Sequence, residues 1–169
     1  MDETSFQPAE ILAALERHGV RYVVIGGLAA ALHGSPLATT DADICPARDV
    51  GNLERLAAAL RELRARIRTP DAPSGLPFTC DATFLSAIQV VLNLTTTFGD
   101  LDVSIVPSGT EGFDDLRRQA IEILLAGHRI SVAALSDVIR SKEAANRPKD
   151  QAALPTLRLL LRRLQEGPR

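Results

Sequence analysis

The sequence has few of the residues that form disulfide frameworks, zinc sites or aromatic platforms for nucleic-acid bases. Tryptophan is absent from the 169 residues, and aromatic residues make up only 4%. Single-stranded nucleic-acid sites need aromatic platforms, and Tyr22 and Phe98 are too isolated to indicate one. The two cysteines, Cys45 and Cys80, have neither zinc-site spacing nor the density of a disulfide scaffold. No Ser-His or Cys-His pair indicates nucleophilic catalysis.

Long apolar runs and an excess of positive charge are also missing. No run approaches the ~18 apolar residues of a membrane span, and the first ten residues, MDETSFQPAE, are acidic where a secretory signal would be basic and then apolar. We therefore expect a cytoplasmic protein with no membrane partner. The formal net charge of −2 excludes a uniformly basic surface, so any contact with nucleic acid requires a local basic patch.

The pattern of apolar residues predicts an α+β domain. Hydrophobic residues make up 46% of the chain and charged residues 24%, as in globular proteins. Helical and β periodicities alternate along the chain. The expected helices are 8–19, 28–34, 52–67, much of 112–125, 135–146 and 149–165. The expected strands are 20–27, 41–45, a hairpin within 89–106, and a short strand near 128–132, with a loop at 69–77.

Two aspartates one residue apart, in the stretch DADI, raise the main functional question. In a strand, residues i and i+2 project from the same face about 7 Å apart, so Asp41 and Asp43 would repel each other. In the later stretch GDLDVSIV, Asp100, Asp102 and Ser104 share a face. If the two strands are neighbours, three carboxylates converge, with either Asp100 or Asp102 as the third. Such a cluster is suited to Mg²⁺ or Mn²⁺ and to phosphoryl or nucleotidyl transfer.

A pair of glycines upstream supplies a complementary feature. Gly26 and Gly27 end the expected strand and precede a helix, which lets backbone N–H groups approach a phosphate closely. Alone, a Gly-Gly here is usually a packing turn, and an Asp-x-Asp is usually a solvated turn. Their order along the chain, followed by a third strand-borne aspartate, favours a nucleotide site.

This order of motifs resembles the nucleotidyltransferase superfamily with the DNA polymerase β-like fold. The matching residues read IGG, DADI and LDV. Further along, the stretch ISVAALSDVIRSKEAANRPKD is similar to the lysine-containing helix of the AbiEii and MenT-type nucleotidyltransferase toxins. Many relatives carry an arginine shortly before the first aspartate, and Leu37 stands near that place, so triphosphate binding must use other cations.

The resemblance implies a fold and a set of site residues. It implies one nucleotidyltransferase domain over 1–169, with a mixed sheet flanked by helices, a core of about 20–106 and a C-terminal helical part of about 112–169. The implied metal ligands and catalytic carboxylates are Asp41, Asp43 and Asp102, with Lys142 as a catalytic cation. The implied nucleotide-binding residues are Gly26, Gly27, Lys142, Arg147, Lys149 and Asp150.

The resemblance also implies a function. The expected reaction is Mg²⁺- or Mn²⁺-dependent transfer of NMP from an NTP to RNA, in particular the 3′ end of tRNA, by a growth-inhibiting toxin with a cognate antitoxin. Two alternatives stay open: a transferase that modifies a protein, and a non-catalytic binding module. The sequence does not indicate which NTP base is preferred or what the oligomeric state is.

Two basic stretches and one threonine complete the candidates. Arg61, Arg64 and Arg68 repeat at helical spacing, and Arg158, Arg162 and Arg163 form a second stretch. Either could contact a phosphate backbone, although a solvated helix face is the more common role. Thr39 should share the face of the aspartates. By resemblance to toxins silenced by phosphorylation, Thr39 is the expected target of an antitoxin kinase, because a phosphate there would repel the triphosphate.

Overall fold

The structure is a computed structural model that describes residues 5–167. Its centre is one mixed eight-stranded sheet in the order β4-β3-β5-β6-β2-β1-β8-β7. The pairs β2–β6 and β1–β8 are parallel, and the other neighbours are antiparallel. The strands are β1 (Tyr22–Ile25), β2 (Asp41–Pro46), β3 (Arg66–Thr69), β4 (Ala72–Leu76), β5 (Val91–Thr96), β6 (Gly99–Ser104), β7 (Ile121–Leu125) and β8 (His128–Val132).

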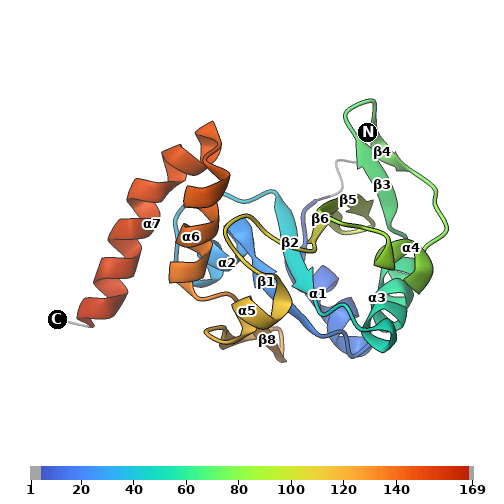
Figure 1. Cartoon of the computed structure of the whole chain (residues 1–169), viewed down its shortest axis with the longest axis horizontal. Helices are drawn as coiled ribbons and strands as arrows, with labels where there is room; N and C mark the ends of the chain where they lie inside the picture. The colour runs from blue at the N-terminus through green and yellow to red at the C-terminus, as the bar shows by residue number, and fades with distance from the viewer. Residues whose placement is uncertain (1–4, 168–169) are drawn as a thin grey trace.

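Helices flank this sheet, and all four residues of β1 are buried among them. They are α1 (Pro8–Arg17), α2 (Gly26–Leu32), α3 (Val50–Glu62), α4 (Ala82–Ser86), α5 (Phe113–Arg117), α6 (Leu135–Ala145) and α7 (Pro148–Glu166). Figure 1 shows α6 and α7 side by side at one end of the molecule, with α3, α4 and the β3–β4 hairpin at the other. The predicted α+β class, with a mixed sheet and C-terminal helices, is confirmed.

Alternation along the central strands separates a buried face from a face that carries polar groups. The buried side chains of β2, β5 and β6 are Ala42, Ile44, Leu92, Leu94, Leu101 and Val103. They join one core with the apolar side chains of α1 and α3. Asp41, Asp43 and Asp102 alternate with these residues and are only partly buried, so they project from the opposite face. The hydrophobic effect on one face therefore fixes where the carboxylates point on the other.

Two expected segments are corrected by the structure. The stretch 69–77, expected as a loop, contains β4, which forms a hairpin with β3. Pro73 is tolerated because β4 is an edge strand. The segment 112–125, expected to be mainly helical, holds only the short α5 and then β7, which pairs with β8.

The helix expected over 52–67 is also shorter than its pattern indicates. It ends at Glu62, and Arg64 adopts a positive φ of 54° that turns the chain. Ile67 and Arg68 consequently lie on β3 instead of continuing the helix. The expected one-sided row of Arg61, Arg64 and Arg68 is therefore wrong. At the other end, Pro148 opens α7 as its first residue, where a missing N–H costs nothing.

No helix among residues 5–167 is both long enough and apolar enough to cross a membrane.

Candidate active site

The pairing of β2 with β6 brings the acidic residues together. In the parallel register, Asp43 lies opposite Asp102 and Asp41 lies opposite Asp100. Carboxylate oxygens of Asp41, Asp43 and Asp102 all lie within 4.8 Å of one another. Within residues 5–167, this is the one group of three acidic, histidine or cysteine side chains close enough to share an ion. The structure thus places Asp102, rather than Asp100, as the third member.

Burial and mutual repulsion shape the electrostatics of this cluster. Burial, followed by the charges of Asp41 and Asp102, raises the pKa of Asp43 to about 7. Burial also raises the pKa of Asp102, to about 6, although the nearby Arg68 guanidinium opposes the shift. The donor set consists only of carboxylate oxygens, as hard divalent cations such as Mg²⁺ and Mn²⁺ prefer. The residues therefore fit such an ion, which would remove the repulsion.

Gly26 is required by the close approach of α2 to the cluster. Its φ is +64°, and a Cβ there would lie 2.5 Å from Asp43 Oδ2. A Cβ on Gly27 would lie 3.1 Å from Thr39 Oγ1. Because α2 begins at Gly26, the first N–H groups of this helix have no partner within it. Both glycines line the cavity beside the carboxylates, as a phosphate-binding turn requires.

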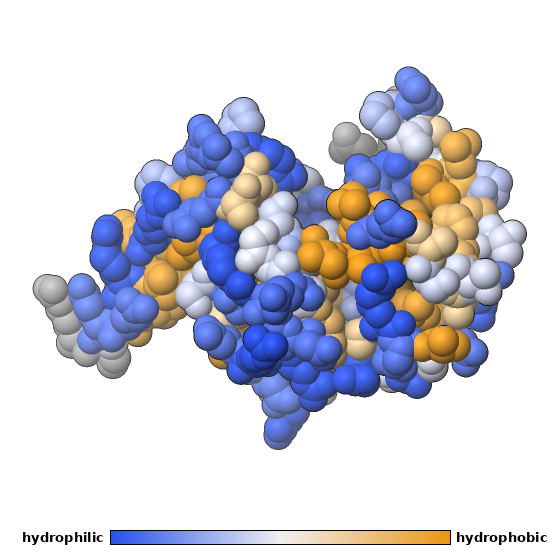
Figure 2. Space-filling view, viewed as in Figure 1, coloured by the Kyte–Doolittle hydropathy of each residue, from blue (hydrophilic) through white to orange (hydrophobic). Residues whose placement is uncertain are grey.

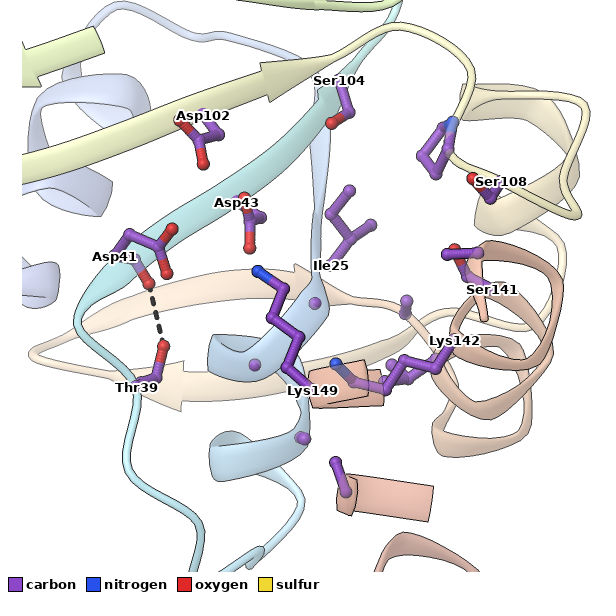
Figure 3. A pocket seen from close by; sticks show the side chains of 18 of the residues that line it. Ile25, Thr39, Asp41, Asp43, Asp102, Ser104, Ser108, Ser141, Lys142 and Lys149 are labelled. Carbon is purple, nitrogen blue, oxygen red and sulfur yellow. Dashed lines mark hydrogen bonds between the residues drawn. The ribbon is translucent and has the colours of Figure 1, made fainter. Parts of the chain in front are cut away.

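The C-terminal helices place cations on the opposite wall. Lys142 stands in the last turn of α6, and Lys149 and Asp150 stand in the first turn of α7. Figure 3 shows the Lys149 side chain reaching toward Asp43, with Lys142 beside it. The positive charge of Lys149 in turn lowers the pKa of Asp43, against the larger effects that raise it.

Asp150 organises the junction between α6 and α7. Its fully buried carboxylate accepts hydrogen bonds from Arg147 Nε at 2.7 Å and from the Arg147 backbone N–H at 3.1 Å. Lys142 Nζ lies 3.4 Å from the same carboxylate. Burial would raise the pKa of Asp150, but the hydrogen bonds from Arg147 hold it below its usual range. Asp150 therefore holds both Lys142 and Arg147, whereas Lys149 has no ion-pair partner in the described part of the chain.

These walls enclose a cavity of about 880 Å³. Its size is in the range of small-molecule sites. Figure 2 shows the molecule hollowed between the C-terminal helices and the strand-rich part, with apolar side chains on one rim. Beyond Asp102 the wall consists of Asn93, Ser104 and three exposed valines, Val90, Val91 and Val106. Leu37 also lines the cavity.

Thr39 lines the cavity next to Asp41, on the side predicted from the sequence. Its hydroxyl donates a hydrogen bond to the Asp41 backbone carbonyl at 3.1 Å (Figure 3). This bond anchors the turn before β2. Its expected role as a phosphorylation site stays a prediction.

Arg68 is the residue of this site that the sequence did not reveal as part of it. Its helical spacing with Arg61 and Arg64 suggested a helix face, but Arg68 contacts both Asp100 and Asp102. The signal that could have located it is the alternation of RIRT, which is typical of a strand.

Comparisons with known proteins identify the fold. No protein-family model matches the chain, and no curated protein matches its sequence significantly. Solved structures do match. One is the lincosamide antibiotic adenylyltransferase LnuA in its lincomycin-bound form, with a TM-score of 0.62 at 14% identity. The match covers 94% of this chain and 99% of the LnuA chain. The chain has the nucleotidyltransferase fold.

Two further structures share this nucleotidyltransferase fold. A Thermotoga maritima protein assigned as a nucleotidyltransferase matches with a TM-score of 0.56 at 18% identity, covering 95% of this chain and 98% of its own. ANT(2″)-Ia, in complex with adenylyl-2″-tobramycin, matches with a TM-score of 0.56 at 15% identity, covering 89% and 83%. At these identities the likeness establishes the fold, so the roles of the site residues rest on their geometry and on experiment.

The raised pKa values predict how the metal-free protein responds to pH. Unfolded aspartates titrate near pH 4, so between about pH 4 and 7 the folded protein binds more protons than the unfolded chain. Its free energy of unfolding should therefore fall as pH rises from about 4 to about 7, by about 1–3 kcal/mol. Thermal or denaturant unfolding in the presence of a chelator measures this slope.

Two comparisons check the source of that slope. Asp43→Asn should flatten it and should stabilise the protein at the alkaline end, while Asp71→Asn, an exposed turn residue, should leave it unchanged. Saturating Mg²⁺ should also remove the slope, because a bound cation holds its ligands ionised. An Asp43→Asn protein with the full wild-type slope would show that the cluster is not its origin.

Proposed function

We propose that this protein is a nucleotidyltransferase that moves NMP from an NTP to a hydroxyl acceptor with the help of Mg²⁺ or Mn²⁺. The observation that carries the proposal is the convergence of Asp41, Asp43 and Asp102 in one cavity, opposite lysines from two helices. The nucleotidyltransferase fold supports it. A divalent metal bound by the carboxylates would activate the attacking oxygen and neutralise charge on the phosphates.

Each wall of the cavity has a separate task in this proposal. Gly26 and Gly27 allow the polyphosphate to approach the start of α2. Lys149 supplies an unpaired positive charge to the phosphates, and Lys142 adds a second charge from its anchored position on Asp150. Asp102, at the edge nearest the valine-lined wall, faces the acceptor hydroxyl and receives its proton. Attack on the α-phosphorus joins NMP to the acceptor and releases pyrophosphate.

The acceptor proposed first is RNA, and in particular the 3′ end of tRNA. The similarity of residues 130–150 to the AbiEii and MenT-type toxins supports this choice. Modification of that end would block aminoacylation, so the protein would act as a growth-inhibiting toxin with a cognate antitoxin. Under this proposal, phosphorylation of Thr39 would silence it, because the new charge would stand beside Asp41 and repel the triphosphate.

A second candidate acceptor is a small hydroxylated compound. LnuA is a lincosamide antibiotic adenylyltransferase, and ANT(2″)-Ia was solved with adenylyl-2″-tobramycin. The acceptor wall of this chain combines the exposed valines with Asn93 and Ser104, which suits a compact molecule with apolar and hydroxyl faces. The two acceptors predict different labelled products.

One assay tests the proposed function. The purified protein is incubated with each α-labelled NTP and Mg²⁺, together with total tRNA, a cell extract, or lincomycin and tobramycin. We expect label on RNA; label on a small compound would support the second acceptor, and label on protein would support a protein-modifying transferase. Asp43→Asn should reduce transfer about a thousandfold, since several kcal/mol of charge stabilisation is lost, whereas Asp71→Asn should not.

Label on no acceptor, or near-normal transfer by Asp43→Asn, would contradict the proposal. The first result would favour a non-catalytic nucleotide-binding module, which ligand binding without turnover would identify.

The two lysines give a separate prediction about NTP binding. Lys149→Ala and Lys142→Ala should each weaken the affinity for a non-hydrolysable NTP, since a charge-assisted contact is worth about 1.5–3 kcal/mol, or one to two decades. Because Asp150 already holds Lys142, the loss should be larger for Lys149→Ala. Calorimetric titration with Mg²⁺ present measures both.

The matched control is Arg158→Ala, which removes an exposed α7 cation paired with Glu143 away from the cavity. It should leave NTP affinity unchanged. A wild-type dissociation constant in Lys149→Ala would remove that residue from the nucleotide site.

A further inference from the structure

Arg68 reaches the acidic cluster from a strand that is not next to it. It lies on β3, and β5 separates β3 from β6, which carries Asp100 and Asp102. Its Nη2 donates to Asp102 Oδ1 at 2.8 Å, and its Nε lies 3.3 Å from Asp100 Oδ2. The Arg68 side chain is only 28% exposed, and that of Asp102 is 15% exposed. Among the arginines that form ion pairs within residues 5–167, Arg68 has the least exposed side chain.

The Asp102 carboxylate contacts Arg68 and also belongs to the acidic cluster. Oδ1 accepts a hydrogen bond from the guanidinium, and a carboxylate oxygen of Asp102 lies within 4.8 Å of carboxylate oxygens of Asp41 and Asp43. A guanidinium is a planar fork that can hold two carboxylates in fixed directions, which an ammonium cannot do. Asp100 occupies the second arm of the fork and keeps Arg68 from swinging away.

The positive charge of Arg68 competes with a metal ion for the negative charge of the cluster. A positive charge next to the cluster lessens the repulsion among the carboxylates but also weakens their attraction for a second cation. If Arg68 served only to hold the fold together, its loss would weaken every property of the site together. If it orients Asp102, its loss should harm transfer while leaving cation affinity intact or improved.

We propose that Arg68 is a positioning residue that aims the Asp102 carboxylate at the reacting hydroxyl, at the expense of metal affinity in the resting protein. This inference rests on the proposed nucleotidyl transfer and adds to it a residue from outside the two motif-bearing strands. Arg68 touches neither phosphate nor acceptor in this role; it acts through Asp102.

The experiment compares Arg68→Gln and Arg68→Lys with a matched control, Arg66→Gln. Arg66 lies two residues away on the same strand, but its guanidinium donates to the Gly75 carbonyl instead of to a carboxylate. For each protein we measure kcat and KM for the NTP, the affinity of the resting protein for Mn²⁺ alone, and the melting temperature. The work is done at about pH 8, where ordinary carboxylates are ionised.

Arg68→Gln should lower kcat about tenfold to a hundredfold, the usual cost of releasing a group that orients a metal ligand. KM for the NTP should stay within about twofold, because the phosphate-binding residues are unchanged. Affinity for Mn²⁺ should be unchanged or up to about tenfold tighter. Arg68→Lys should recover part of kcat, and Arg66→Gln should match the wild type in kcat and Mn²⁺ affinity.

Three results would overturn the inference. They are an unchanged kcat in Arg68→Gln, a fall in kcat equalled by Arg66→Gln, and a joint fall of kcat, Mn²⁺ affinity and melting temperature, which would mark Arg68 as part of the scaffold. Failure of the proposed function looks different, because the wild-type protein itself would then transfer no label. In that case the positioning role falls together with the proposed function, and Mn²⁺ affinity tests only whether the charge of Arg68 opposes a bound cation: weaker binding by Arg68→Gln would contradict that opposition.

Discussion

Mutual repulsion among three carboxylates is the constraint on which the rest of the site depends. The register of β2 against β6 sets Asp43 opposite Asp102, and the packed core on the other face of the sheet prevents these side chains from turning away. Burial first, and this repulsion after it, raise the pKa values of Asp43 and Asp102. Each neighbouring feature either relieves this repulsion or allows a ligand to do so.

Residues on three sides of the cluster accommodate its charge. Gly26 leaves room for the Asp43 carboxylate where any Cβ would collide with it. Arg68 neutralises the cluster from the β3 side, and Lys149 approaches it from α7. Asp150 keeps Lys142 and Arg147 at the helix junction, so that they do not collapse onto the carboxylates. An acidic floor and a cationic wall thus remain separated by a cavity, an arrangement suited to a metal-bound polyphosphate.

The parts of this site that could be predicted from sequence are those with a local pattern. Alternation in DADI and GDLDV predicted that the aspartates share faces, and the glycine pair marked the strand end. Which of Asp100 and Asp102 joins the cluster depends on the β2–β6 register, a non-local property that alternation alone does not fix.

The contact of Arg68 with the cluster was not predicted, although RIRT alternates as a strand does, because a competing local pattern masked it. Its helical spacing with Arg61 and Arg64 concealed the positive φ at Arg64 that ends the helix. The strand β4 was missed because Pro73 and Gly75 are typical of loops, although an edge strand accommodates both. Local propensity failed at both places because tertiary pairing decided the outcome.

The central claim is that Asp41, Asp43 and Asp102 together hold a divalent metal beneath an NTP. Anomalous diffraction from crystals containing Mn²⁺ and a non-hydrolysable NTP tests it most directly. The account predicts Mn²⁺ between these carboxylates, with the phosphates running from Gly26 and Gly27 toward Lys149. Mn²⁺ bound elsewhere, or an NTP seated away from the carboxylates, would contradict it.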